Sequence, residues 1–125
     1  TGGEPLDQLT TEHLSFFKEH GYFQALETSG LHPAPDGFDF ICVAPKVAEH
    51  VVKKNFPNGV TELRYVRHGG QSVPEPAITA VHYWISPHSD GFDINTVNLK
   101  HCINLCLQNP KWKMSVQQHK TWSVL

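Results

Sequence analysis

The chain has 125 residues, enough for one domain (1–125) with a buried core. Its composition, with 39% hydrophobic and 18% charged residues, indicates a globular protein. Its formal net charge of −2 provides no general attraction to nucleic acids or anionic membranes, so we expect neither as a direct partner. No apolar run of about 18 residues predicts a membrane-spanning helix, and we recognise no secretory signal peptide.

The first half of the sequence predicts a helix, two strands and a second helix. Residues 9–22 have helical spacing, with Thr10 or Thr11 as the cap and Gly21 at the end. FQALETSG predicts a short strand that runs into a turn. Residues 38–46 form an almost continuous apolar run, which is typical of a strand buried on both faces of a parallel sheet. Residues 47–56 again have helical spacing.

The second half predicts three strands and one helix. TELRYVRHGG and residues 77–87 are strand candidates. Residues 95–110 predict an amphipathic helix that ends before Pro110. Its apolar face is expected to contain Leu99, Cys102, Ile103, Cys106 and Leu107. WKMSVQQHKTW predicts a last strand, because Trp112, Met114 and Val116 alternate.

Strands that alternate with helices predict an α/β fold with a mostly parallel sheet. Binding sites of such folds lie at the carboxyl ends of the strands. The expected strand ends read ETSG, APK, RHGG, SPHSDG and QQHK, which are polar, small or basic. We therefore predict that they form one polar cleft. The opening TGGEP also has the character of a strand end, so we expect a strand before it.

Two acidic residues at strand ends are the first candidates for ligand binding. Gly2 and Gly3 permit a ligand to approach the backbone closely, and Glu4 can accept hydrogen bonds from an ammonium group. A simple loop explains the same residues. Glu27 follows apolar strand residues and suits ribose hydroxyls, although an acid in a salt bridge at the rim remains an alternative.

The later strand ends supply a lysine, hydroxyl groups and imidazoles. Lys46 could reach an anionic group or could simply be exposed. Ser86, His88 and Ser89 stand on one loop. Gln117 and His119 would share a face of the last strand, where an amide and an imidazole suit the polar edge of a flat heterocycle. A surface histidine is the alternative for His119.

A metal site receives little support from the spacing of cysteines and histidines. Three cysteines are too few for a disulfide framework, which favours a reducing cytoplasm. Cys102 and Cys106 share a helix face, where apolar packing and a metal-binding pair are both open. The nine histidines show no HExxH or similar pattern. The sequence also contains no GxSxG, P-loop or GxGxxG motif.

Taken together and in order, TGGEP, LETSG, APK, SPHS and WKMSVQQHK resemble the 7-carboxy-7-deazaguanine synthase family of radical S-adenosylmethionine enzymes. The resemblance runs through essentially the whole chain. TGGEP and ETSG are widespread among radical S-adenosylmethionine proteins. The ending with Trp112, Ser115, Gln117, His119 and Lys120 is more particular to this family and disfavours another radical S-adenosylmethionine enzyme.

The resemblance implies a partial β/α barrel with S-adenosylmethionine, a [4Fe-4S] cluster and magnesium. It also implies contraction of 6-carboxy-5,6,7,8-tetrahydropterin to 7-carboxy-7-deazaguanine, in queuosine biosynthesis, through a 5′-deoxyadenosyl radical. By position, it implies cofactor contacts at Gly2, Gly3, Glu4, Glu27, Ala44, Pro45, Lys46, Ser86, Pro87, His88 and Ser89. It implies substrate contacts at Thr1, Gln117, His119 and the terminal carboxylate of Leu125, with Glu27 facing either the cofactor or the pterin.

The resemblance also implies that this chain matches the carboxyl-terminal half of such a barrel. The family's cluster cysteines and magnesium contact lie in the amino-terminal half, and Cys42, Cys102 and Cys106 stand elsewhere. Two motif positions depart from the family, with Ala44 in place of serine and Ser86 in place of glutamine. We expect the chain alone to be inactive and the protein to be a homodimer. The alternative is a non-catalytic half-barrel binding module that oligomerises through its open sheet edge.

Overall fold

The computed structural model describes residues 2–91 and 93–122, which fold into two compact units. The amino-terminal unit comprises residues 1–63 and 76–81, and the carboxyl-terminal unit comprises residues 64–75 and 82–125. The helices are a 3-10 turn at Pro5–Asp7, α1 (Thr11–Glu19), α2 (Glu49–Asn55), α3 (Thr96–Gln108) and α4 (Gln118–Thr121). The strands are β1 (Ala25–Thr28), β2 (Phe40–Val43), β3 (Val60–Arg67), β4 (Ala80–Pro87) and β5 (Trp112–Met114).

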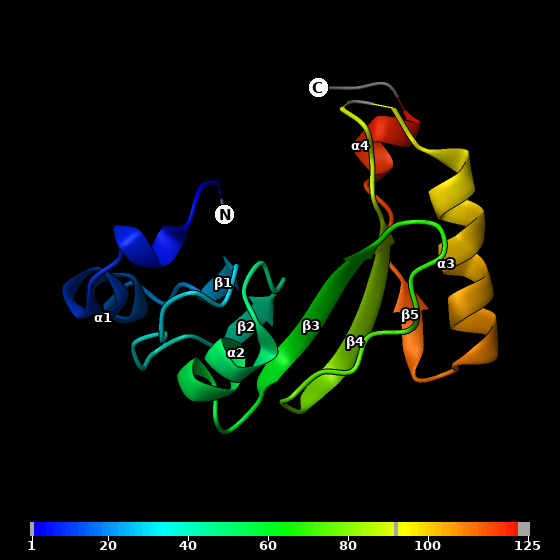
Figure 1. Cartoon of the computed structure of the whole chain (residues 1–125). Coiled ribbons are helices and arrows are strands. Elements are labelled where there is room, and N and C mark those ends of the chain that lie inside the picture. Colours follow the sequence, from blue (N-terminus) through cyan, green and yellow to red (C-terminus); the bar gives the residue numbers. More distant parts are fainter. Residues whose placement is uncertain (1, 92, 123–125) are drawn as a thin grey trace. The chain divides into compact units, whose positions relative to one another are not determined.

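Parallel strands organise the amino-terminal unit (Figure 1). Ala25 pairs with Phe40, Thr28 pairs with Val43, and Val43 also pairs with Leu63 of β3. Val43, Val52 of α2 and Leu63 are fully buried, so the predicted apolar run of β2 does enter the core. Burying one such side chain contributes about 1.5–3 kcal/mol.

The predicted first helix is confirmed as α1, together with the signals at both ends. The backbone N–H of Thr10 donates to Nδ1 of His13 at 3.2 Å, which satisfies a donor just before the helix begins. Gly21 follows the helix with a φ of +75°, a conformation that suits glycine at a helix end.

The carboxyl-terminal unit contains β5 paired in parallel with β4 and covered by α3 (Figure 1). Tyr83 pairs with Trp112, and Ile85 pairs with Met114. The Trp112 ring packs edge-on against Tyr65 and Tyr83, with centroids 5.8 Å and 5.3 Å away. This aromatic cluster, with the fully buried Ile85, forms the core of the unit.

Within the described residues the strands are hydrogen-bonded in the order β1-β2-β3-β4-β5, and all are parallel. Each unit contains part of the β3–β4 pairing. Val60 donates to the Thr79 carbonyl at 3.1 Å in one unit, and His88 donates to the Arg67 carbonyl at 3.0 Å in the other. The predicted α/β class with a parallel sheet is confirmed, whereas closure into a partial barrel stays a prediction. None of the helices in the described ranges is long and apolar enough to cross a membrane.

The last predicted strand is wrong beyond Met114, because the chain turns into α4. Gln117 precedes this helix and His119 lies within it, so they do not alternate along a strand. The physical reason lies in β4. Ser115 donates to the Ile85 carbonyl at 2.8 Å, and the next bond of a parallel ladder would need an N–H from Pro87, which has none.

The predicted apolar face of α3 is correct only in part. Cys102 is fully buried, but Ile103 and Leu107 are exposed, Leu107 by 74%. The helix packs instead through Cys102 and the buried amide of Asn98. Asn98 Oδ1 accepts from Gly69 N–H at 2.8 Å, and its Nδ2 donates to the His88 carbonyl at 3.0 Å. Burial of Asn98 is stable because both ends of the amide are satisfied.

We expect Gly59→Ala to destabilise the chain by about 2–5 kcal/mol, because alanine would have to adopt a left-handed backbone conformation and its Cβ would overlap a neighbouring atom. The φ of Gly59 is +83°, and a Cβ there would lie 2.6 Å from the Thr79 carbonyl oxygen, the acceptor of the Val60 bond. Gly21→Ala is the matched control, because its φ is +75° and its Cβ would meet nothing within 4 Å. Urea unfolding should show the larger loss at Gly59, and equal losses would contradict the close approach.

Candidate functional site

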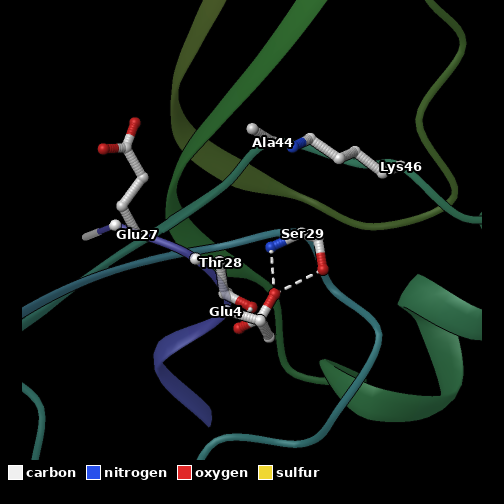
Figure 2. Close-up of a pocket in the computed structure, with 8 residues that line it drawn as sticks. Glu4, Glu27, Thr28, Ser29, Ala44 and Lys46 are labelled. Carbon is white, nitrogen blue, oxygen red and sulfur yellow. Dashed lines mark hydrogen bonds between the residues drawn. The ribbon is translucent and has the colours of Figure 1, made fainter. Parts of the chain in front are cut away.

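A cleft of about 460 Å³ lies at the carboxyl ends of β1 and β2, within the amino-terminal unit (Figure 2). It is lined by Gly2, Gly3, Glu4, Glu27, Thr28, Ser29, Ala44 and Lys46. These residues come from the opening turn, from the end of β1 and from the segment after β2. The cleft therefore brings together three of the predicted motifs, TGGEP, ETSG and APK.

Backbone pairing of β1 and β2 continues past both strands and positions this lining. The N–H of Ala44 donates to the Thr28 carbonyl at 2.9 Å, and the N–H of Lys46 donates to the Ser29 carbonyl at 3.2 Å. The residues after one strand are thus held beside the residues after the other. This arrangement follows from parallel pairing, which places both carboxyl ends at one edge of the sheet.

The carboxylate of Glu4 joins the opening turn to the end of β1. Its Oε1 accepts from the Thr28 hydroxyl at 2.6 Å and from the Leu6 N–H at 3.4 Å. Its Oε2 accepts from the Ser29 N–H at 2.9 Å and from the Ser29 hydroxyl. Thr28 Oγ1 in turn accepts from the Gly30 N–H at 3.2 Å. Figure 2 shows Glu4 directed at Thr28 and Ser29.

Glu4 is held in its ionised form. Burial by itself would raise the pKa of this carboxyl, but the hydrogen bonds from Ser29, Thr28 and Leu6 together lower the pKa below its ordinary value. A negative charge therefore persists beside the cleft at neutral pH.

Glu27 and Lys46 give the cleft one further carboxylate and one ammonium group. Glu27 is half-buried, and Lys46 is exposed. Figure 2 shows the Glu27 carboxylate directed away from the cluster around Glu4. With the hydroxyl groups and the backbone of the glycine turn, this set suits a ligand that carries both an ammonium and a carboxylate.

Of the residues predicted to bind a cofactor, six line the cleft: Gly2, Gly3, Glu4, Glu27, Ala44 and Lys46. Pro45 stands between two lining residues without lining the cleft itself. Sequence reasoning did not name Thr28 and Ser29 as site residues, although both belong to the ETSG motif. Two consecutive hydroxyl side chains directly after a strand-end acid were the signal that could have identified them.

The predicted SPHS loop lies in the carboxyl-terminal unit. Ser86 and Pro87 are buried at the end of β4, whereas His88 and Ser89 are half-buried. The His88 ring stacks on the His68 ring, with centroids 4.1 Å apart and planes inclined by 25°. Its Nδ1 lies 3.6 Å from Asp90 Oδ1, which is too far for a hydrogen bond.

The residues predicted to border the substrate belong to the same unit or lie outside the described residues. Gln117, just before α4, and His119, within α4, are both exposed. Lys120 Nζ donates to the Gly91 carbonyl at 2.7 Å, which fastens this helix to the loop after β4. Thr1 and Leu125 fall outside the described residues. The single cleft of all five strand ends therefore stays a prediction.

The cysteines are placed as packing residues. Cys42 and Cys102 are buried, and Cys106 is half-buried. Burial raises the pKa of Cys102 to about 11, with the neighbouring Cys106 adding to the effect, and burial also raises the pKa of Cys106. In the part of the chain that the structure describes, no three His, Cys, Asp or Glu side chains gather as a metal site.

Comparison with known proteins identifies relatives over nearly the whole chain, although no protein-family model matches it. The 7-carboxy-7-deazaguanine synthase of Caulobacter vibrioides is 35% identical over 122 residues, which cover 96% of this chain and 55% of that protein. Those of Bradyrhizobium diazoefficiens and Haemophilus influenzae are 32% and 34% identical, with 99% and 96% of this chain covered. The chain spans 55–61% of the length of these relatives, consistent with the expected carboxyl-terminal half.

We expect Glu4→Gln to cost about 1–3 kcal/mol of unfolding free energy at pH 7, since bonds to a charged acceptor are lost. The folded-state pKa of Glu4 is lowered, so its contribution is present above the ordinary value of 4.5 and is lost as the pH falls through the folded pKa. Urea unfolding of both chains from pH 7 to pH 3 should therefore converge at low pH. Glu19→Gln, on the exposed end of α1, controls for loss of a charge in the same unit. A difference independent of pH would contradict the assignment.

We expect anaerobic addition of iron and sulfide to this chain to give no [4Fe-4S] absorbance. Cluster ligation needs several thiolates at one place, and burial keeps the Cys102 thiol protonated, with a pKa of about 11. Alkylation of all three thiols in urea would verify that they are reduced at the start. A stoichiometric cluster signal would overturn the packing role of these cysteines.

Proposed function

The chain is related over nearly its whole length to the 7-carboxy-7-deazaguanine synthases, and we propose that it forms the S-adenosylmethionine-binding part of such an enzyme. The observation that carries this proposal is the cleft at the ends of β1 and β2, which six of the expected cofactor residues line. A ligand with an ammonium and a carboxylate matches the charges that this cleft offers.

Each group of the cleft has a role in this proposal. The turn at Gly2 and Gly3 presents its backbone to the methionine amino group, and Lys46 attracts the methionine carboxylate. Glu27 accepts from hydroxyl groups of the cofactor or from the pterin. Ala44 lets the backbone after β2 approach the ligand without the hydroxyl group that the family commonly has there. The loop at residues 86–89 borders the cofactor in the complete site.

The proposed reaction is the conversion of 6-carboxy-5,6,7,8-tetrahydropterin to 7-carboxy-7-deazaguanine, a cytoplasmic step of queuosine biosynthesis. S-adenosylmethionine, when bound, supplies the group that removes a hydrogen atom from the substrate. Gln117 and His119 are proposed to bind the polar edge of the pterin, together with Thr1 and the carboxylate of Leu125. Being exposed, Gln117 and His119 are accessible to a substrate.

The iron–sulfur cluster and the magnesium ion do not fit the residues that the structure describes. Cys42 is buried in β2, Cys102 and Cys106 belong to α3, and no group of three ligating side chains is present in the described ranges. We assign neither group to this chain and expect no turnover by the chain alone.

A second candidate function is a non-catalytic binding module that assembles through the edge of its sheet. The observation in its favour is a group of exposed aromatic side chains on α1 and on the segment that joins α1 to β1, namely Phe16, Phe17, Tyr22 and Phe23. The Phe17 ring contacts the rings of Phe16 and Tyr22. Among the described strands, β1 is an edge strand, and such edges associate readily. This module would hold a ligand tightly without a cluster, whereas the synthase part would bind S-adenosylmethionine weakly. A homodimer is compatible with either function.

Calorimetric titration of the chain with S-adenosylmethionine tests the proposed function. We expect weak, saturable binding that Glu27→Gln weakens about tenfold, the effect of one lost charge-assisted bond of roughly 1.4 kcal/mol. Glu19→Gln should leave the affinity unchanged, because α1 does not line the cleft. Absence of saturable binding would exclude S-adenosylmethionine from this cleft, whereas equal affinities of the two variants would assign Glu27 to the pterin and not to the cofactor. Tight binding by a sedimenting oligomer would favour the second candidate.

A further inference from the structure

A buried amide near the start of α3 joins two loops of the carboxyl-terminal unit. Asn98 is only 7% exposed. Its Oδ1 accepts from the Gly69 N–H at 2.8 Å, and its Nδ2 donates to the His88 carbonyl at 3.0 Å. Gly69 follows β3 and His88 follows β4, so the amide connects the loops at the carboxyl ends of two strands. Ligands of parallel α/β sheets bind at this edge.

An amide is the side chain that suits both loops. The Gly69 N–H needs an acceptor and the His88 carbonyl needs a donor, and the two ends of the Asn98 amide supply one of each. A carboxylate would accept from Gly69 but repel the His88 carbonyl, and a leucine would bond to neither. Asn is also a poorer helix former than leucine or alanine. The bonds to the two loops, and not helix propensity, therefore explain an Asn at this position.

Further contacts hold the same two loops against α3. His101 Nε2 donates to the Gln71 carbonyl at 2.7 Å, and Gln71 Oε1 accepts from the His68 N–H at 2.7 Å. On the other loop, Asn95 Nδ2 donates to Asp90 Oδ2 at 3.0 Å. His101 belongs to α3, and Asn95 is its N-cap residue. One helix thus sets the positions of both loops.

The two loops that Asn98 joins carry a pair of stacked imidazole rings. The ring centroids of His68 and His88 are 4.1 Å apart, and the ring planes are inclined by 25°. His68 is exposed and His88 is half-buried, so the pair is accessible to a ligand. Flat heterocycles stack on aromatic side chains, histidine included. Sequence reasoning named His88 as a site residue but did not name His68.

We propose that Asn98 is a positioning residue, which holds the loops after β3 and β4 together so that the stacked rings of His68 and His88 form a platform for a flat heterocycle of the ligand. The adenine of S-adenosylmethionine and the pterin are both flat heterocycles, and both suit such a platform. Asn98 acts through the loops and does not itself touch the ligand. This inference rests on the proposed function and adds His68 to the residues expected to contact a ligand.

Nuclear magnetic resonance of the whole chain, with ¹³C-labelled His rings and ¹⁵N-labelled amides, tests the positioning role without ligand. The rings of His68 and His88 should show cross-relaxation in the unmodified chain. Asn98→Leu should abolish this signal and speed the exchange of the Gly69 amide. Asn98→Asp should abolish it while the Gly69 amide stays protected, because the carboxylate still accepts from Gly69.

The matched control for both variants is Asn104→Asp, because Asn104 is exposed on the same helix. This control should leave the ring contact and the Gly69 amide unchanged. Absence of ring contact in the unmodified chain would overturn the proposal. Rings that remain in contact in folded Asn98→Leu and Asn98→Asp chains would overturn it as well.

Separate additions of S-adenosylmethionine and of 6-carboxypterin test the platform and identify the heterocycle that it binds. One of the two compounds should shift the ring signals of His68 and His88 to saturation. His68→Ala and Asn98→Leu should each weaken this binding about tenfold, the effect of one lost stacking contact. His68→Phe keeps a flat ring and should bind as the unmodified chain does, a rescue that a merely structural role of His68 does not predict.

Two results would refute the platform: neither compound shifts the ring signals, or His68→Ala binds as tightly as the unmodified chain. The amide signals of Gly3 and Lys46 report on the cleft of the amino-terminal unit, which these two residues line. Their response to S-adenosylmethionine tests the proposed function independently of the imidazole rings. Failure of the platform and failure of the proposed function are therefore distinguished in the same samples.

Discussion

The parallel pairing of β1 with β2 is the constraint on which the candidate site depends. Their register puts Thr28 opposite Val43, and two further bonds extend the pairing to Ala44 and Lys46. Residues separated by some 15 positions in the chain are thereby set side by side. Gly30 tightens this arrangement, because a Cβ there would lie 3.1 Å from the fully buried Val43. The site and the core of the amino-terminal unit thus share the same strands.

Much of the architecture could be predicted from the sequence, because hydrophobic patterns report directly on burial. The apolar run around Val43 and the alternation of Leu63 with Tyr65 identified buried strands, and these three residues are in the core. The predictions failed where a single bond or side chain decides the outcome. Pro87 lacks the N–H that would continue the pairing of β5, and α4 follows. Alternation within WKMSVQQHKTW contains no information about a neighbouring strand.

The hydrophobic periodicity of the sequence also does not predict which side of a helix packs or which groups bind a carboxylate. Asn98 replaces Ile103 in the interior because both ends of its amide find partners in separate loops. Hydrophobicity alone predicts that Ile103 is buried and Asn98 is exposed. Glu4, which was expected to bind the cofactor, does line the cleft, and its oxygens accept from Thr28 and Ser29, about 25 residues later in the chain. Motifs indicate which residues matter at a site, whereas their roles follow from contacts between segments.

A carboxylate whose oxygens already accept hydrogen bonds from the chain can still attract a cation nearby. Hydrogen bonds to Glu4 stabilise its ionised form, so the negative charge is retained. At an effective dielectric constant of about 20, two unit charges roughly 6 Å apart attract by about 3 kcal/mol before desolvation costs. A cation close to Glu4 would gain part of this attraction without displacing the donors that the chain supplies to the carboxylate. The arrangement thereby avoids an unpaired donor on Thr28 or Ser29, which would offset much of a direct bond. Glu4 can thus keep both its negative charge and a fixed position, because its hydrogen-bond donors belong to the chain itself.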